Sequence, residues 1–536
     1  MSGAHSAIHP MNRRKFITHG TATAGIFAGA LTRSFGAEAK SGATVDTTGG
    51  KIRGLVIDRV NAFKGIPYGA STAGDRRFLP PARPEAWTGI KDTIMWGPEA
   101  PQVSPHTEIP EVRATIPGTG MSEDCLRLNV WTSGLGRGDK RPVMVWLHGG
   151  GFTSGNGSYS IYDGTNLAKK RDVVAVTINH RLNSFGFLHL PEIGGAKFAQ
   201  ASNVGMLDAI AALQWVHDNI ANFGGDPNNV TIYGQSGGAG KVSTLLAMPG
   251  AKGLFHRAII ESGSNLKAVS VADATATAKA VMAKLNVKTV DELQRVPMQQ
   301  LIQATTATPG LRLAPVVDGN TLPRDPFSPD APPMSADVPV LLGTVETEVT
   351  FFPGTPLDPI DDDALLARVK TAARADDAQA RHLIDLYRTG RPSVSDIDLA
   401  LILESDLRFR PGVVTEAELK SAQKAPVYMY YFTWRSPVRE GKLKTFHTLE
   451  IPFVTDNVDN GQSMTGTGQD RYALENKMSA AWTAFARTGN PGHKGLPAWP
   501  KFDTAKRATM IFNHECKVVN DPNGEERKAL AALRRA

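Results

Sequence analysis

The pentapeptide at residues 234–238, Gly-Gln-Ser-Gly-Gly, constrains the fold of this chain more than any other segment. It fits the pattern G-x-S-x-G. Residues 230–233 before it are β-branched and aromatic, which suits a buried strand, and residues 239–248 after it have the composition of a helix. A serine at such a sharp strand-to-helix turn has its hydroxyl lifted out of the sheet, and glycines leave room for the strained backbone. Glycine and serine also form ordinary turns, but the flanking strand and helix favour a nucleophile elbow at Ser236.

Several short apolar runs predict buried strands. They are continuous and rich in β-branched residues, as expected for parallel strands covered by helices on both faces. These runs are residues 143–147, 173–178, 230–233, 258–260, 338–342 and 427–434. Between two of them, residues 206–223 place apolar side chains at the spacing of one helix face. Strand, helix and strand in alternation predict an α/β sandwich with a mostly parallel central sheet.

Two long stretches interrupt this strand pattern. Residues 274–303 and 361–424 are rich in alanine, leucine and charged residues, and we expect them to be helical. We interpret them as helical insertions, at about residues 265–335 and 355–425, that cover the carboxyl edge of the sheet. Open α/β sheets bind their ligands at that edge. No convincing linker divides the chain, so residues 40–536 are predicted to form a single domain.

The overall charge excludes some classes of partner. The net charge is +7, of which +3 belongs to the first 39 residues. No basic stripe with interleaved aromatic residues is present in the sequence, which argues against nucleic-acid binding. No apolar run reaches the ~18 residues that a membrane span needs, so stable membrane insertion is not expected.

The N-terminus resembles an export signal. Residues 12–17 contain a twin arginine, Arg13 and Arg14, and a weakly apolar stretch at 20–31 follows, with an A-x-A site at 37–39. Residues 1–39 therefore predict bacterial twin-arginine export and a periplasmic or secreted protein; the alternative is a disordered basic tail. Both Met1 and Met11 are candidate starts.

A serine hydroxyl needs helpers before it can act as a nucleophile. It needs a base, an acid that orients the base, and donors for the oxyanion that forms on attack. Residues 148–151, His-Gly-Gly-Gly, follow a predicted strand and match the oxyanion loop that accompanies such elbows. The candidate donors are the amides of Gly149, Gly150 and Gly237; a flexible turn is the alternative interpretation of the three glycines.

These motifs together resemble the type B carboxylesterase family of the α/β-hydrolase superfamily, which includes cholinesterases and bacterial para-nitrobenzyl esterases. The resemblance covers most of the chain after about residue 46. Besides the elbow and the triple glycine, it rests on residues 63–68 (FKGIPY), 122–126 (SEDCL), 222–227 (NFGGDP) and 485–491 (FARTGNP). It implies the α/β-hydrolase fold, with helical excursions over the active site.

The resemblance also implies an acid and a base. The family's acid is the sixth residue of a segment that here spans residues 343–348, which gives Glu348, although this chain has Thr347-Glu348-Val349 where the family has Asp-Glu-Gly. Glu346 is the rival, and either glutamate could be a surface charge. The base is His447, in the matching segment 446–454. The order Ser236, Glu348, His447 is that of α/β-hydrolases.

Three further positions follow from the resemblance. Ser262 corresponds to a serine that hydrogen-bonds the acid and the histidine, although it also fits a simple turn. Next to the nucleophile, Gln235 stands where the family has glutamate, and Gly237 where it has alanine. The glycine keeps its amide donor, so the oxyanion hole should survive.

The chain has two cysteines, Cys125 and Cys516, and two independent thiols are the expectation. The family often pairs the first with a cysteine whose position here is taken by Ala100, so that disulfide is predicted to be absent.

The resemblance implies a serine hydrolase that cleaves small-molecule carboxylic esters through an acyl-enzyme, with no metal or organic cofactor. Two alternatives stay open: the same chemistry on an amide, carbamate or lactone, and a non-catalytic binding protein on the same scaffold. Residues 101–124 contain no Trp, Tyr or Phe, so the aromatic side chain that would stack on a choline ester is not found there. The sequence leaves the oligomeric state open.

Overall fold

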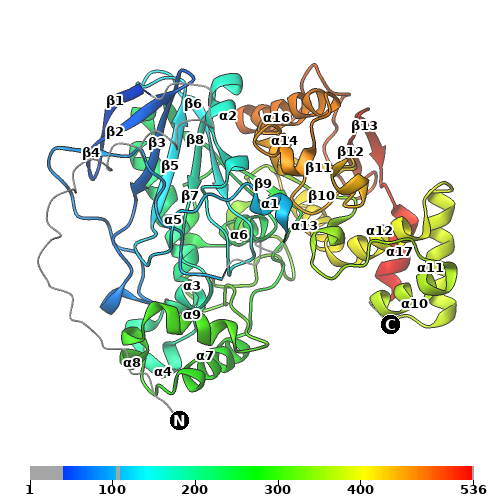
Figure 1. The fold of residues 1–536 in the computed structure, drawn as a ribbon, viewed down its shortest axis with the longest axis horizontal. Coiled ribbons are helices and arrows are strands. Elements are labelled where there is room, and N and C mark those ends of the chain that lie inside the picture. Colours follow the sequence, from blue (N-terminus) through cyan, green and yellow to red (C-terminus); the bar gives the residue numbers. More distant parts are fainter. Residues whose placement is uncertain (1–39, 104–108, 534–536) are drawn as a thin grey trace, which may run out of the picture.

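A computed structural model describes residues 40–103 and 109–533 of the chain. The predicted export signal, residues 1–39, lies outside the described residues. Thirteen described strands form one twisted sheet that runs through the molecule (Figure 1). The strands are β1 Lys40–Thr47, β2 Gly50–Ile57, β3 Val60–Pro67, β4 Ile90–Asp92, β5 Arg127–Thr132, β6 Arg141–Leu147, β7 Val174–Ile178, β8 Gly225–Gln235, β9 Arg257–Glu261, β10 Val340–Val345, β11 Val427–Phe432, β12 Ala508–Phe512 and β13 Lys517–Asn520.

The centre of the sheet is parallel and its two edges are antiparallel. From β7 through β6, β8, β9, β10 and β11 to β12, each neighbouring pair is parallel. Strands β1, β2, β3 and β5 add an antiparallel edge on one side, and β13 adds one on the other. The mostly parallel sheet predicted from the apolar runs is therefore confirmed, and each of the six runs overlaps a strand, although residues 173, 338–339 and 433–434 lie outside the strands.

The central strands are buried on both faces. Along β6, Val143, Val145 and Leu147 pack into one hydrophobic cluster, whereas Met144 and Trp146 pack into another. Because side chains alternate between faces of a strand, these two clusters are the two layers between sheet and helices. Helices α5 and α6 contribute to the first layer, and α16 contributes to the second.

Helices cover both faces of the sheet, and two further groups of helices form the insertions. The helices are α1 Pro110–Arg113, α2 Thr165–Arg171, α3 Asn183–Phe187, α4 Pro191–Gly194, α5 Val204–Asn219, α6 Gly237–Leu245, α7 Val271–Leu285, α8 Val290–Arg295, α9 Met298–Thr306, α10 Asp362–Ala373, α11 Asp377–Gly390, α12 Asp396–Arg408, α13 Arg410–Ser421, α14 Ile451–Val454, α15 Gln462–Thr465, α16 Asp470–Thr488 and α17 Gly524–Leu533. The helices expected at residues 274–303 and 361–424 are present as α7–α9 and α10–α13.

Both insertions contact segments that follow the carboxyl ends of strands. Helix α9 packs on α3, which follows β7, and α12 packs on the segment that follows β10. The second group of helices also packs with the C-terminal α17, as Figure 1 shows at the right of the view. The α12–α13 junction is thereby fixed close to the carboxyl edge of the sheet.

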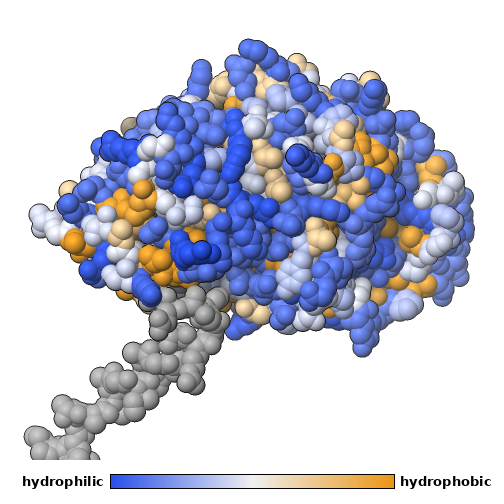
Figure 2. Space-filling model, turned by 90° about the horizontal axis from the view of Figure 1, so that it is seen from above, coloured by the Kyte–Doolittle hydropathy of each residue, from blue (hydrophilic) through white to orange (hydrophobic). Residues whose placement is uncertain are grey.

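One face of the molecule shows mostly polar residues (Figure 2). The face drawn in Figure 2 is dominated by hydrophilic residues, and its apolar residues form small separate patches. Within residues 40–103 and 109–533, no helix has the length and apolar character needed to cross a bilayer.

Candidate active site

Ser236 occupies a strained turn between β8 and α6. Its backbone has φ 57° and ψ −122°, in a region that costs a non-glycine residue on the order of 1–3 kcal/mol. The amide of Ser236 donates to the carbonyl of Glu261 on the neighbouring β9, at 2.8 Å. The predicted strand, turn and helix are therefore present, and the strain is located at the serine.

The glycines around Ser236 are required by close backbone contacts. A Cβ atom on Gly238 would lie 2.0 Å from the carbonyl oxygen of Leu147, and one on Gly237 would lie 2.3 Å from the backbone of Gly151. Neither backbone neighbour can move aside cheaply in a packed core. This contact explains why residue 237 is glycine rather than alanine in this chain.

The glycine loop, residues 148–151, wraps around the elbow. Gly150 and Gly151 have positive φ angles of 91° and 61°, which glycine adopts at little cost. The three loop glycines line a cavity of about 380 Å³ together with Ser236 and His447. The sequence singled out Gly149, Gly150 and Gly237; the structure adds Gly151, which touches Gly237.

The structure brings Glu348, and not Glu346, to His447. The Nδ1 atom of His447 lies 2.5 Å from Oε2 of Glu348, and the other carboxylate oxygen accepts the amide of Val345 at 3.0 Å. Glu346 is directed instead at Arg435, at 3.4 Å. In the described part of the chain, the hydroxyl of Ser236 makes no hydrogen bond to His447; such bonds are often long before substrate binds.

Burial governs the charge of this pair. Desolvation lowers the pKa of His447 to about 4, although nearby Glu450 opposes that shift. Desolvation also raises the pKa of Glu348, and its hydrogen bonds to Val345 and Ser262 oppose that shift. The imidazole is therefore neutral at neutral pH, and because Nδ1 faces Glu348, the Nε2 lone pair is available.

Gln235 is packed against this histidine. Its amide nitrogen lies 3.2 Å from both ring nitrogens of His447, and a Cβ atom added to Gly149 would lie 3.5 Å from its amide oxygen. The side chain thus lies between the imidazole and the glycine loop. Because it is neutral, it does not stabilise the imidazolium as a glutamate would.

Ser262 connects the pair to a second buried glutamate. Its backbone has φ 49°, and its hydroxyl donates to Oε1 of Glu450 at 3.0 Å. Burial and the nearby Glu348 raise the pKa of Glu450 to about 8. No sequence motif singled out Glu450, although it lies three positions after His447 in the segment that identified the histidine.

Below Glu450 lies a third buried acid, Glu261. It accepts the indole N–H of Trp482 at 2.7 Å. Burial raises its pKa well above the usual range, and Glu450 raises it further. The raised pKa values of Glu261 and Glu450 favour the neutral forms of both acids and so oppose a buried cluster of negative charge beneath the site.

Aromatic side chains enclose His447. The ring centres of Phe351, Phe352 and Phe409 lie 5.4, 5.7 and 4.8 Å from the imidazole centre. Phe409 comes from the α12–α13 junction, so the helical insertion contributes directly to the site. The cavity is lined by Phe351 and Phe352 together with Tyr159, Tyr162, Ile109, Val112, Ile161 and Ile451, and none of the described residues that line it is Asp, Glu, Lys or Arg. No sequence pattern pointed to these residues.

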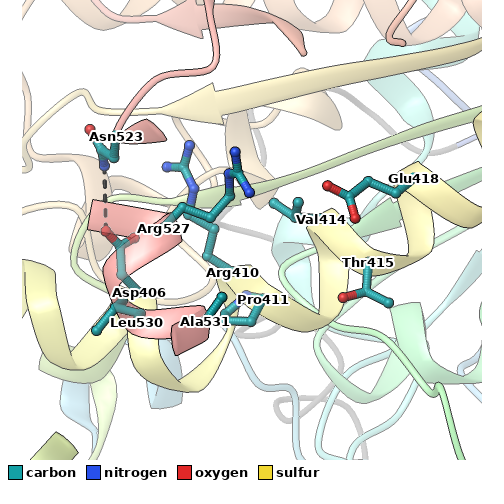
Figure 3. Close-up of a pocket in the computed structure, with 10 residues that line it drawn as sticks. All are labelled: Asp406, Arg410, Pro411, Val414, Thr415, Glu418, Asn523, Arg527, Leu530 and Ala531. Atoms are coloured by element: carbon teal, nitrogen blue, oxygen red, sulfur yellow. Dashed lines mark hydrogen bonds between the residues drawn. The ribbon is translucent and has the colours of Figure 1, made fainter. Parts of the chain in front are cut away.

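A second cavity, of about 310 Å³, lies between α13 and α17 (Figure 3). Its charged lining residues are Asp406, Arg410, Glu418 and Arg527, whose formal charges cancel. Among the described residues, neither serine nor histidine lines it, so they provide no nucleophile with a base there. We therefore assign no catalysis to it.

The described residues hold no cluster of three or more His, Cys, Asp or Glu side chains that could bind a metal ion. Cys125 and Cys516 are both free and buried, as expected for independent thiols. Ala100 packs in the same hydrophobic cluster as Cys125.

Comparison with known proteins places these features in context. Residues 41–530 match the model of the carboxylesterase family. The chain is 35% identical over 506 residues to a para-nitrobenzyl esterase of Bacillus subtilis (strain 168), covering 91% of this chain and 98% of that protein. It is 34% identical over 489 residues to a phenmedipham hydrolase of Pseudarthrobacter oxydans, covering 88% and 94%.

A solved structure agrees with the sequence comparison. The crystal structure of a carboxylesterase from Geobacillus stearothermophilus superposes with a TM-score of 0.79 at 38% identity, covering 91% of this chain and 99% of that one.

Proposed function

Because this chain belongs to the carboxylesterase family and is a serine carboxylic-ester hydrolase, we propose that its substrates are small, uncharged esters that carry an aromatic or aliphatic group. The observation that carries this proposal is the cavity at Ser236, of about 380 Å³, which is walled by aromatic and aliphatic side chains. An anionic or cationic ester would lose its hydration there without gaining a charged partner.

In the proposed first step, His447 takes the proton of Ser236 as the serine oxygen attacks the ester carbonyl. The support for this role is the 2.5 Å contact between His447 and Glu348, which fixes the ring and leaves Nε2 as the acceptor. Glu348 then stabilises the imidazolium that forms.

The oxyanion of the tetrahedral intermediate is assigned to the amides of the glycine loop and of Gly237. Support comes from the cavity, which Gly149 and Gly150 line beside Ser236, and from the close contact between Gly237 and Gly151. Removing one such donor typically costs ~10²–10³ in turnover.

The intermediate collapses when His447 protonates the leaving alcohol, which leaves an acyl group on Ser236. Water that is deprotonated by His447 then attacks the acyl-enzyme and releases the carboxylic acid. The residues of this chain supply each proton transfer.

The nucleophile is tested by Ser236→Ala. Because the hydroxyl forms the acyl-enzyme, hydrolysis of a para-nitrophenyl ester should fall by a factor of about 10⁴ or more. Ser264→Ala, at a serine just after β9, is the matched control and should keep at least about half of wild-type activity.

The substrate class is tested by comparing kcat/KM for a panel of esters, amides, carbamates and lactones. Neutral esters should have the highest values.

Retention of most esterase activity by Ser236→Ala would remove the nucleophile from the proposal. A higher kcat/KM for a charged ester, an amide, a carbamate or a lactone than for every neutral ester would contradict the proposed substrate class. A serine-directed organophosphate should inhibit the enzyme by bonding to Ser236. Inhibition with the label on a different residue would show that another serine is the nucleophile.

Gln235→Glu tests the protonation of His447. Only the neutral imidazole can accept the serine proton, so the acid limb of kcat/KM reports the pKa of the free enzyme's base. Burial lowers the pKa of His447 to about 4, and a carboxylate at position 235 would raise it by favouring the imidazolium. The acid limb should therefore move to higher pH by about one unit.

The matched control is Gln300→Glu, on the exposed surface of α9, which should leave the pH profile unchanged. An acid limb that stays in place or moves to lower pH in Gln235→Glu would show that this side chain does not set the pKa of the base.

We also propose that the protein is exported through the twin-arginine pathway; Arg13, Arg14 and the A-x-A site at 37–39 support this. In a bacterial host, the enzyme should be recovered from the periplasm or medium in a shortened form. Changing Arg13 and Arg14 to lysine should retain the full-length protein in the cytoplasm, whereas Arg33→Lys should not. Equal export of both variants would contradict the proposal.

A further inference from the structure

A lysine is buried directly beneath the glycine loop. Lys241 lies on α6, the helix that begins after Ser236, and its side chain is 0% exposed. Its ammonium donates to the carbonyl oxygen of His148 at 2.9 Å. Among the described residues, no carboxylate lies within ion-pair distance of it.

Burying an ammonium without a counter-ion is unfavourable. Desolvation lowers the pKa of Lys241 to about 7, and a methionine would fill the same space without that cost. The presence of lysine where methionine would cost less indicates that its hydrogen bond matters at this position, and not only its volume.

The atom that Lys241 holds belongs to the first peptide unit of the glycine loop. The carbonyl of His148 and the amide N–H of Gly149 lie in one planar trans peptide and point in opposite directions. A donor that fixes the carbonyl from one side thus fixes the direction of the N–H on the other. It also polarises the peptide, which strengthens that N–H as a donor.

The other end of the loop is held separately, because the carbonyl of Gly150 accepts the backbone amides of Thr153 and Ser154 at 3.3 and 3.0 Å. Gly150 and Gly151 carry no side chains, and both have positive φ angles. At the far end of the loop, the ring of Phe152 lies 6.0 Å from the same ammonium. Lys241 therefore bonds the first peptide of the glycine loop and lies near the residue that follows the loop, from the helix that begins directly after Ser236.

We propose that Lys241 is a positioning residue for the oxyanion loop: it holds the His148–Gly149 peptide so that the loop amides face the oxyanion formed at Ser236. This inference rests on the function proposed above. We therefore expect Lys241 to help stabilise the transition state and to have little effect on substrate binding.

Lys241→Met removes the donor and is compared with Lys420→Met. Lys420 is also buried and donates to a backbone carbonyl, that of Ser335 at 2.7 Å, but it does not line the catalytic cavity. Active sites are titrated with an organophosphate, so that unfolded protein does not count. Per titrated site, kcat of Lys241→Met should fall about tenfold or more, with KM within threefold of wild type.

Affinity for a trifluoromethyl ketone provides the second measurement, because the ketone forms an oxyanion on the serine. It should fall by about the same factor as kcat/KM in Lys241→Met and should be unchanged in Lys420→Met. Wild-type kcat and ketone affinity in Lys241→Met would overturn the proposal, as would an equal loss in Lys420→Met.

If Lys241→Met does not fold, Lys241→Ala is judged by the same two quantities. A different result would contradict the proposed function. If the organophosphate does not titrate the wild-type enzyme, Ser236 is not the nucleophile. A titratable wild type with an unaffected Lys241 variant contradicts only the role of the lysine.

Discussion

The rest of the site depends on the contact between the elbow glycines and the end of β6. Leu147 is in register with Gly234 on the neighbouring parallel strand β8, and Gly238 lies so close that a Cβ atom would be 2.0 Å from the Leu147 carbonyl. This approach brings the strained serine and the glycine loop to one end of the sheet. Two backbone segments far apart in sequence thereby form one site, and side chains at these glycines would separate them.

Around this backbone contact, burial sets the chemistry. His447 is kept neutral by desolvation and is oriented by Glu348, while Gln235 adds no charge next to it. Glu450 and Glu261 lie deeper, with pKa values raised by the same burial. Phe351, Phe352 and Phe409 pack around the imidazole, so the apolar surroundings of His447 come from the segment that follows β10 and from the α12–α13 junction as well as from the sheet.

Local patterns predicted the central strands, the elbow and the insertion helices, because each depends on residues close in sequence. The contact of His447 with Glu348, rather than with Glu346, required the family register, since both glutamates are near the end of the same strand. Phe409, Glu450 and Lys241 were not predicted. Their positions depend on how the α12–α13 junction, the start of α14 and α6 pack against the site, and a single buried phenylalanine, glutamate or lysine carries no periodic signal. The sequence shows glycine at position 237 where the family has alanine, but only the folded structure shows the contact with Gly151 that requires it.

The central claim is that Ser236, His447 and the glycine loop act together on one carbonyl group. It is tested most directly by a crystal structure of the enzyme after reaction with an organophosphate. We predict a phosphorus atom bonded to Oγ of Ser236, with its phosphoryl oxygen within hydrogen-bond distance of amides from the glycine loop and Gly237. A phosphorylated residue elsewhere, or a phosphoryl oxygen that points away from these amides, would contradict the claim.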